Sequence, residues 1–230
     1  MQQIERLGVI MSTLILIIHA LSGTIGILAG FATLLVEKAT PRHMTLGTVF
    51  VIAMLFLGVS GSLVAYSRSI SLSLINGLLL CYLIGSSWLT INNKANKPQI
   101  IEKMLAVIPL GLCFSLIHFA QVAAESPTGK LDSFSAPVFY FFAFIAGISF
   151  VSDIVYFMKG GYSGHQKTIR HLWRMCFPLF MATAAFFLGQ AKLFPAPMQN
   201  IFLLAAPVVF VIIAMFYWLL KELVHNYKAS

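Results

Sequence analysis

Four histidines of this chain lie in or at the edge of long apolar segments, where imidazole can ligate a metal, carry a proton or hydrogen-bond. His19 and His118 lie well inside two such segments, and His43 and His171 each follow an arginine near the start of another. At 1.5 Å per residue, His19 and His118 lie about 15 Å and about 9 Å from the same predicted side. Imidazoles at similar depth on different helices are what axial haem ligands require. The sequence therefore predicts haem b, with His19 and His118 as metal ligands in one layer and His43 and His171 in a second.

Other interpretations of these histidines remain open. A histidine inside a membrane is often only hydrogen-bonded to a neighbouring helix, and His43 and His171 could lie beside lipid phosphates. Proton-coupled transport or substrate binding is a third use. Gly23 and Gly26, one and two turns after His19, would leave room for a macrocycle.

The charged residues inside the apolar segments form a second candidate site. Asp153 is the only acidic residue well inside such a segment, and Arg174 lies at a similar depth in the next one. A charge at membrane depth is costly and needs a partner or a role. Because consecutive segments are expected to be antiparallel neighbours, we expect an Asp153–Arg174 pair, joined by Arg170 or His171. Such a pair could be a structural clamp, a proton relay or an anion site.

Two glutamines suggest a third site. Gln121 and Gln190 lie toward the same predicted side as His118, and they could line a polar pocket with it. The alternative is that both amides hydrogen-bond between helices.

These residues are embedded in a strongly apolar chain. Of its 230 residues, 59% are hydrophobic and 10% are charged, and the mean hydropathy is +0.90. A soluble domain has about 25% charged residues, so this surface must face lipid. Segments of membrane-spanning length occupy residues 9–36, 45–66, 70–91, 104–124, 136–158, 172–191 and 200–220. We therefore predict an all-α, polytopic membrane helix bundle, with residues 1–230 forming one domain of about seven transmembrane helices.

The distribution of basic residues predicts the orientation. The formal net charge is +8, but the basic residues lie in short loops, which favours lipid headgroups over nucleic acid as partners. Four of the 15 Lys and Arg residues lie on the side of the N-terminus, and the other eleven lie on the opposite side. Those four are Arg6, Arg68, Lys130 and Lys192. The positive-inside rule then places the N-terminus outside and the C-terminus in the cytoplasm.

One stretch resembles a known group of proteins. Residues 153–190 contain Asp153, the turn Lys159-Gly160-Gly161, the sequence RHLWRM from Arg170 and the sequence FFLGQ ending at Gln190. This pattern resembles a family of uncharacterised bacterial multipass membrane proteins that carry a domain of unknown function. The resemblance implies a bacterial inner-membrane protein, and it implies no activity.

The sequence thus leads to one expectation of function and two alternatives. We expect a haem b-binding electron-transfer protein of the bacterial inner membrane, with membrane lipids and either haem or quinone as partners. A small-solute or proton-coupled transporter, or a non-catalytic assembly or sensory protein, is the alternative.

Overall fold

The computed structural model describes residues 2–229, and it describes the side chains of residues 10–224. Most of this part is helical. The helices are α1 (Gln2–Leu35), α2 (Pro41–Ser67), α3 (Ser71–Asn92), α4 (Ile100–Leu105), α5 (Val107–Glu125), α6 (Ala136–Met158), α7 (Gly164–Phe187) and α8 (Ile201–Ala229). A short hairpin of β1 (Lys130–Leu131) and β2 (Phe134–Ser135) joins α5 to α6, and two single-turn 3₁₀ helices, Ala191–Leu193 and Ala196–Met198, lie between α7 and α8.

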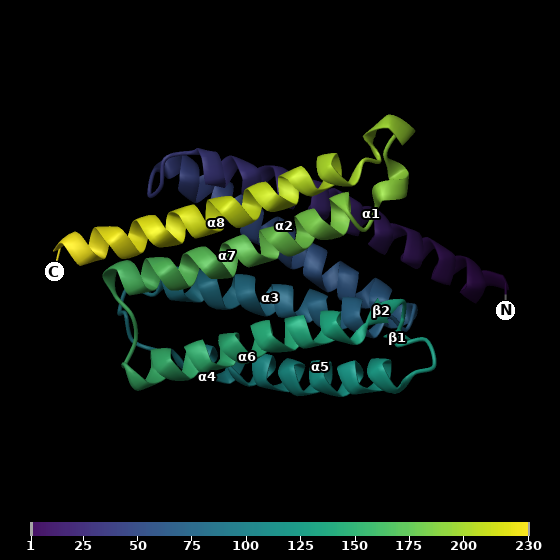
Figure 1. Ribbon diagram of the computed structural model, residues 1–230, viewed down its shortest axis with the longest axis horizontal. Coiled ribbons are helices and arrows are strands. Elements are labelled where there is room, and N and C mark those ends of the chain that lie inside the picture. The colour runs from purple at the N-terminus through teal and green to yellow at the C-terminus, as the bar shows by residue number, and fades with distance from the viewer. Residues whose placement is uncertain (1, 230) are drawn as a thin grey trace.

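Within the described residues, six helical segments are long and apolar enough to cross a membrane. They are Ile10–Leu35, Pro41–Ser67, Ser71–Asn92, Ile100–Glu125, Ala136–Met158 and Ile201–Val224. The all-α multipass bundle is therefore confirmed, and the predicted number of about seven is close. The predicted segment at 172–191 is not among the six, because α7 begins with a strongly polar half that includes Lys167, Arg170 and Arg174. Yet α7 has 24 residues and lies alongside the other long helices (Figure 1).

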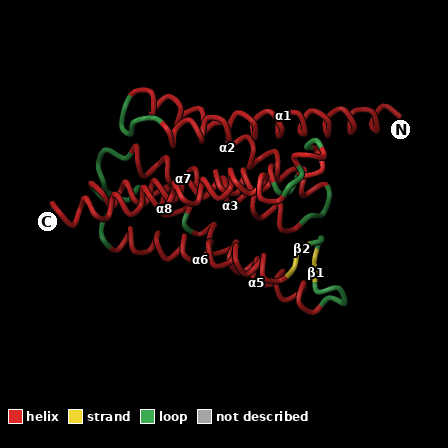
Figure 2. The backbone as a smooth tube through the Cα atoms, turned by 45° about the horizontal axis from the view of Figure 1, so that its top comes forward, coloured by secondary structure: helices red, strands yellow, loops and turns green. Residues whose placement is uncertain are grey.

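Helices α3 and α7 lie at the centre and pack against each other. The α1–α2 pair packs on one side of them, with α2 against α3 and α1 against α7. The α5–α6 pair packs against α3 on the other side, and α8 covers α7 (Figures 1 and 2). Side chains that lie between α3, α6 and α7 are therefore shielded from the lipid around the bundle.

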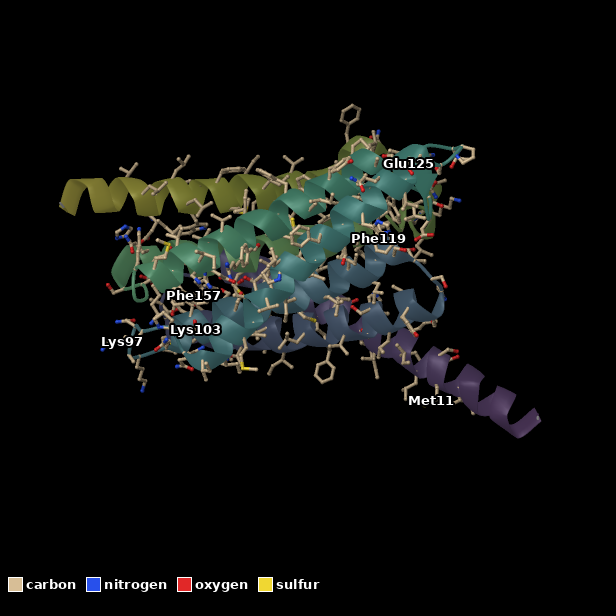
Figure 3. All side chains as sticks on the ribbon, turned by 90° about the horizontal axis from the view of Figure 1, so that it is seen from below. Met11, Lys97, Lys103, Phe119, Glu125 and Phe157 are labelled. Carbon is tan, nitrogen blue, oxygen red and sulfur yellow. The ribbon has the colours of Figure 1, made fainter. Side chains whose placement is uncertain are left out.

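The two ends of the bundle differ in charge. Helix α1 begins and α8 ends at opposite ends of the bundle (Figure 1). Lys97 and Lys103 lie at one end and Glu125 lies at the other (Figure 3). We call the first the basic end; residues 36–40, 93–99 and 159–163 connect the helices there. The cytoplasmic location of this end stays a prediction, and the side chains of Arg6, His225 and Lys228 lie outside the described residues.

Glycines set two close contacts that shape the bundle. A Cβ atom on Gly77 of α3 would lie 2.7 Å from the carbonyl oxygen of Gly58 on α2, so only glycine lets these backbones approach. At the basic end, Gly161 has φ +116, and a Cβ there would lie 1.8 Å from the carbonyl oxygen of Asn96. The Gly160–Gly161 turn can therefore lie directly against the loop between α3 and α4.

Candidate functional site

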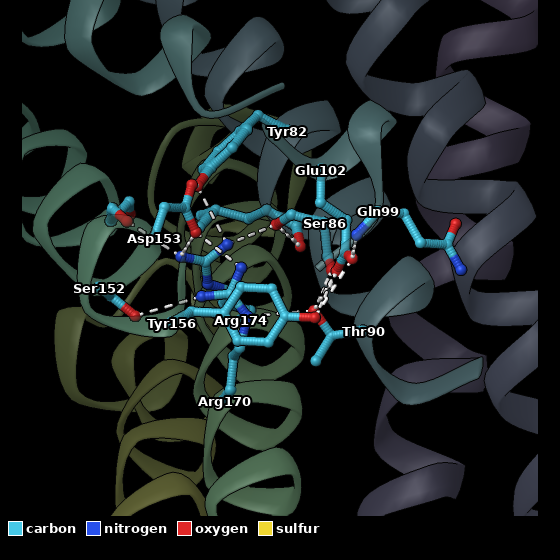
Figure 4. Close-up of polar contacts among 12 residues, drawn as sticks. Tyr82, Ser86, Thr90, Gln99, Glu102, Ser152, Asp153, Tyr156, Arg170 and Arg174 are labelled. Carbon is cyan, nitrogen blue, oxygen red and sulfur yellow. Dashed lines mark hydrogen bonds and ion pairs between the residues drawn. The ribbon is translucent and has the colours of Figure 1, made fainter. Parts of the chain in front are cut away.

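The centre of the candidate site is a carboxylate shared by two arginines. Asp153 Oδ1 lies 2.6 Å from Arg170 Nη2 and 2.8 Å from Arg174 Nη2 (Figure 4). All three side chains are buried, with exposed fractions of 2%, 3% and 0%. The structure thus brings together the three charged residues that the sequence pairs.

The helices do not meet in the way that the sequence suggests. Among the described helices, α6 and α7 are not a closely packed pair, whereas α3 packs against both of them. The long guanidinium groups of Arg170 and Arg174 span the space between α7 and α6 to reach Asp153. The pair therefore depends on side-chain reach rather than on direct packing of consecutive helices.

Helix α3 completes the surroundings of Arg174. The Tyr82 hydroxyl donates to Asp153 Oδ2 and accepts a hydrogen bond of 3.0 Å from Arg174 Nη1. Arg174 also donates to Ser86 Oγ at 2.7 Å and to the carbonyl of Ser149 at 3.0 Å. Asp153 therefore has partners on both oxygens, as a buried carboxylate requires.

A second buried carboxylate, Glu102 of α4, connects to this centre. Arg170 Nε donates to Thr90 Oγ1 at 3.0 Å, and the single hydroxyl hydrogen of Thr90 is shared between the carbonyl of Ser86 at 2.8 Å and Glu102 Oε1 at 3.2 Å. The Tyr156 hydroxyl lies 3.2 Å from each oxygen of Glu102, and the backbone N–H of Gln99 donates to Oε2 at 2.8 Å (Figure 4). Glu102 is 4% exposed, so it belongs to the interior. The sequence alone does not single out Glu102, because this residue stands just before an apolar segment and resembles an ordinary loop residue.

The charges of this network balance only when both acids are counted. Asp153 faces two guanidinium groups, which leaves one positive charge in excess. Within residues 10–224 Glu102 forms no ion pair, and its link to Arg170 runs through Thr90. With both acids ionised, two carboxylates and two guanidiniums sum to zero. The guanidinium of Arg170 also lies 4.6 Å from the ring centre of Tyr156, which adds a cation–π contact.

The network reaches the basic end but stops before the middle of the bundle. Lys167 Nζ donates to the carbonyl of Asn93 at 2.8 Å, and the Asn93 side chain lies 3.4 Å from Glu102 Oε2. Beyond Tyr82, Asp153 and Arg174, each of the three helices presents a buried apolar residue toward the opposite end. These residues are Leu79 on α3, Ala146 on α6 and Leu179 on α7, all at most 2% exposed. Buried apolar side chains thus follow the network along each of the three helices on that side.

The structure does not bring His19 and His118 together. His19 Nδ1 lies 3.2 Å from Ser60 Oγ on α2, and a Cβ on Gly26 would lie 2.9 Å from Met54 Sδ. Side chains of α2 therefore fill the space that the glycines were expected to leave. His118 is exposed on α5, which packs mainly against α6, whereas α1 packs mainly against α2 in the described bundle. These residues do not fit a pair of axial haem ligands, because matching depth does not fix which way a side chain points.

The other two histidines do lie near each other. His43 and His171 are close enough to interact electrostatically. His171 Nδ1 lies 3.0 Å from Ser87 Oγ, whereas His43 Nδ1 is buried without a hydrogen-bond partner among the described residues. No group of three His, Cys, Asp or Glu side chains that could hold a metal ion occurs in the described part of the chain. Haem binding by His43 and His171 stays a prediction.

The predicted glutamine pocket has no counterpart in the geometry. Gln121 is exposed on α5, and Gln190 is exposed in the turn after α7. These two elements are not closely packed in the part of the bundle that the structure describes. The two amides are therefore not brought together, and neither joins the network around Asp153.

Comparison with known proteins found no match among family models, curated proteins or solved structures.

Proposed function

We propose that this protein is a proton-coupled transporter of small anionic solutes in a bacterial inner membrane. The observation that carries the proposal is the sharing of Arg170 between two buried acids, directly with Asp153 and through Thr90 with Glu102. Ionisable groups at membrane depth are costly and are generally kept for ion pathways or proton relays. This network holds four of them within one set of hydrogen bonds.

The balance of charge in the network would couple the binding of a proton to the binding of an anion. Asp153 is held by two guanidinium groups, so Glu102 is the acid that takes up the proton, and its protonation would leave the network with one uncompensated positive charge. Such a charge in a low-dielectric interior strongly favours the arrival of an anion, and a bound anion in turn favours the proton. Proton and anion would therefore bind together, and neither would be stable in the site alone.

The route for protons is also asymmetric. The Tyr82 hydroxyl contacts Asp153 and the Tyr156 hydroxyl contacts Glu102, and the two acids are linked to each other through Arg170 and Thr90. Lys167 and Asn93 connect the network to the basic end, while Leu79 and Ala146 are fully buried apolar residues on the other side. This is the arrangement expected of a transporter with its site accessible from one side of the membrane.

A transport assay in proteoliposomes tests the proposal. With an inward pH gradient, we expect uptake of a radiolabelled small carboxylate such as acetate, lactate or succinate, with proton entry reported by a trapped pH-sensitive dye. Glu102→Gln should abolish both signals because the neutral amide cannot take up the proton. Glu125→Gln is the matched control, since Glu125 is an exposed acid at the opposite end. Uptake in the Glu102→Gln protein equal to that of the wild type would contradict the proposal and favour a structural clamp.

A haem b-binding electron-transfer protein is the second candidate. It is favoured by the unpartnered His43 Nδ1 close to His171. In that case the two imidazoles would be the ligands, and haem would supply one-electron chemistry. A reduced-minus-oxidised absorption spectrum of the purified protein tests this, with His171→Ala expected to remove the haem bands.

A further inference from the structure

The loop that connects α3 to α4 lies between Glu102 and the basic end of the bundle. Glu102 Oε2 accepts a hydrogen bond of 2.8 Å from the backbone N–H of Gln99, and the Asn93 side chain lies 3.4 Å from the same oxygen (Figure 4). Glu102 is 4% exposed, whereas residues 94–97 of the loop are exposed. Residues 93–99 thus separate this carboxylate from the basic end, and we call them the cover loop.

Lys167 of α7 ties the cover loop to the rest of the bundle. Its Nζ donates to the carbonyl of Asn93 at 2.8 Å and to Oδ1 of Asn96 at 3.1 Å. Lys167 has no acidic partner, because every ion pair among residues 10–224 involves Asp153. Within that range its ammonium group therefore hydrogen-bonds only to neutral oxygens of the cover loop, and loss of these two bonds would release the loop from α7.

The turn after α6 also contacts the cover loop. A Cβ atom on Gly161 would lie 1.8 Å from the carbonyl oxygen of Asn96, so only glycine allows the turn to lie against the loop at this point. A Cβ on Gly160 would meet none of the described atoms within 4 Å. A methyl group at residue 161 should therefore displace the cover loop, whereas a methyl group at residue 160 should leave it in place.

The exposed surface around the cover loop is cationic. Lys94 and Lys97 are exposed on the loop, and Lys159 is exposed at the end of α6. None of these lysines forms an ion pair with a described residue. A surface with one sign of charge raises the local concentration of counter-ions, so small anions should gather at the loop that covers Glu102.

We propose that the cover loop is the gate of the transport site and that Lys167 holds this gate closed. A carboxylate that reaches the loop competes with Asn93 and Asn96 for the Lys167 ammonium, and a hydrogen bond between two charged groups is stronger than one to a neutral oxygen. The anion therefore releases the loop, and water from the basic end then reaches Glu102. This inference rests on the proposed function, which takes Glu102 as the proton acceptor, but the opening of the loop is measured without transport.

The first test measures how fast a water-soluble carbodiimide modifies Glu102 in the purified protein. The reagent adds to a protonated carboxyl group that it can reach, and peptide mass spectrometry locates the product. Lys167→Gln should label Glu102 at least about tenfold faster than the wild type, because loss of one hydrogen bond from a charged donor shifts an equilibrium by about that factor. Lys103→Gln is the matched control, since Lys103 is an exposed neighbour of Glu102 in α4 and its loss removes the same charge without breaking the contacts of Lys167.

Asp153 provides the internal reference for this test, because it is 2% exposed and lies further from the basic end than Glu102. Faster labelling of Glu102 with no labelling of Asp153 is the result expected if the loop alone opens. Equal labelling rates in Lys167→Gln and the wild type, or labelling of Asp153 together with Glu102, would overturn the gate.

Two glycine variants test the loop without changing any charge. Gly161→Ala should also speed the labelling of Glu102, and Gly160→Ala, at a second residue with positive φ, should not. Equal acceleration by both variants would mean that strain in the turn, rather than displacement of the loop, exposes Glu102, and this would contradict the proposal.

Hydrogen exchange followed by mass spectrometry tests the opening by an anion. Acetate should speed exchange of the amides of residues 93–99 in the wild type, whereas acetamide, its neutral analogue, should not. Acetate should have no effect in Lys167→Gln, where the loop is already released. The same rate of exchange with acetate and with acetamide in the wild type would contradict opening by the anion.

The gate and the transport function can fail separately. If Lys167→Gln speeds the labelling of Glu102 but proteoliposomes show no uptake, the gate stands and the transport function is wrong. If uptake depends on Glu102 but Lys167→Gln labels this residue no faster than the wild type does, the transport function stands and the gate is wrong.

Discussion

The two halves of the bundle hold their helices together by different means. At the basic end, α6 and α7 do not pack closely, and the side chains of Arg170 and Arg174 reach from α7 to Asp153 on α6. Toward the opposite end, α2 and α3 touch through their backbones at Gly58 and Gly77. A contact made by charges changes when a proton binds, whereas a contact made by glycine backbones does not. We therefore expect the half at the basic end, here called the charged half, to respond to protonation. We expect the half with the Gly58–Gly77 contact, here called the rigid half, not to respond.

The largest expected effect is on the charged half. Asp153→Asn would leave two buried guanidiniums without their counter-ion, and breaking a buried pair costs about 3–5 kcal/mol. We expect a corresponding fall in thermal stability of the purified protein, with Glu125→Gln as a control that leaves it unchanged. Arg174→Leu should also destabilise, and the double variant should lose less than the sum of the two single losses. Additive losses would show that the two residues do not interact.

Next in size is an effect on the rigid half. Gly77→Ala places a Cβ 2.7 Å from the Gly58 carbonyl oxygen, so α2 and α3 must separate. Overpacking of this kind costs about 1–3 kcal/mol. Gly85→Ala on the same helix is the control, because a Cβ there meets nothing within 4 Å in the described structure. Equal melting temperatures for the two variants would mean that the close α2–α3 contact contributes nothing to stability.

The sequence predicts some parts of these two halves and not others. The long apolar segments predict the helices, and the cost of a charge at membrane depth singles out Asp153 and its arginines. The position of a residue along a helix does not determine the direction in which its side chain points. His19 and His118 lie at similar depth, but only the His19 side chain points inward, toward α2.

The partners that complete the network could not be predicted for a related reason. Tyr82 and Tyr156 resemble any other aromatic residue in an apolar segment, and Glu102 resembles a loop acid. Their roles follow from the position of α3 between α6 and α7, which is a property of the whole bundle. Local composition contains no signal for that arrangement.

The smallest expected change in stability comes from a variant that affects Glu102 but not Asp153. Tyr156→Phe removes the hydroxyl that lies 3.2 Å from both oxygens of Glu102 and leaves the partners of Asp153 in place. A hydrogen bond to a charged group is worth about 1.5–3 kcal/mol. The remaining partners of Glu102, which are Thr90, the Gln99 N–H and the Asn93 side chain, should hold the loss near the lower figure. Tyr66→Phe, at a tyrosine that is 76% exposed, should leave the melting temperature unchanged. If Tyr156→Phe lowers the melting temperature as much as Asp153→Asn does, then Glu102 and Asp153 act as one unit. In that case Glu102 is the group that neutralises the excess positive charge beside Asp153. If Tyr156→Phe is as mild as Tyr66→Phe, the tyrosine serves proton passage rather than stability, and its effect should appear only in the transport assay.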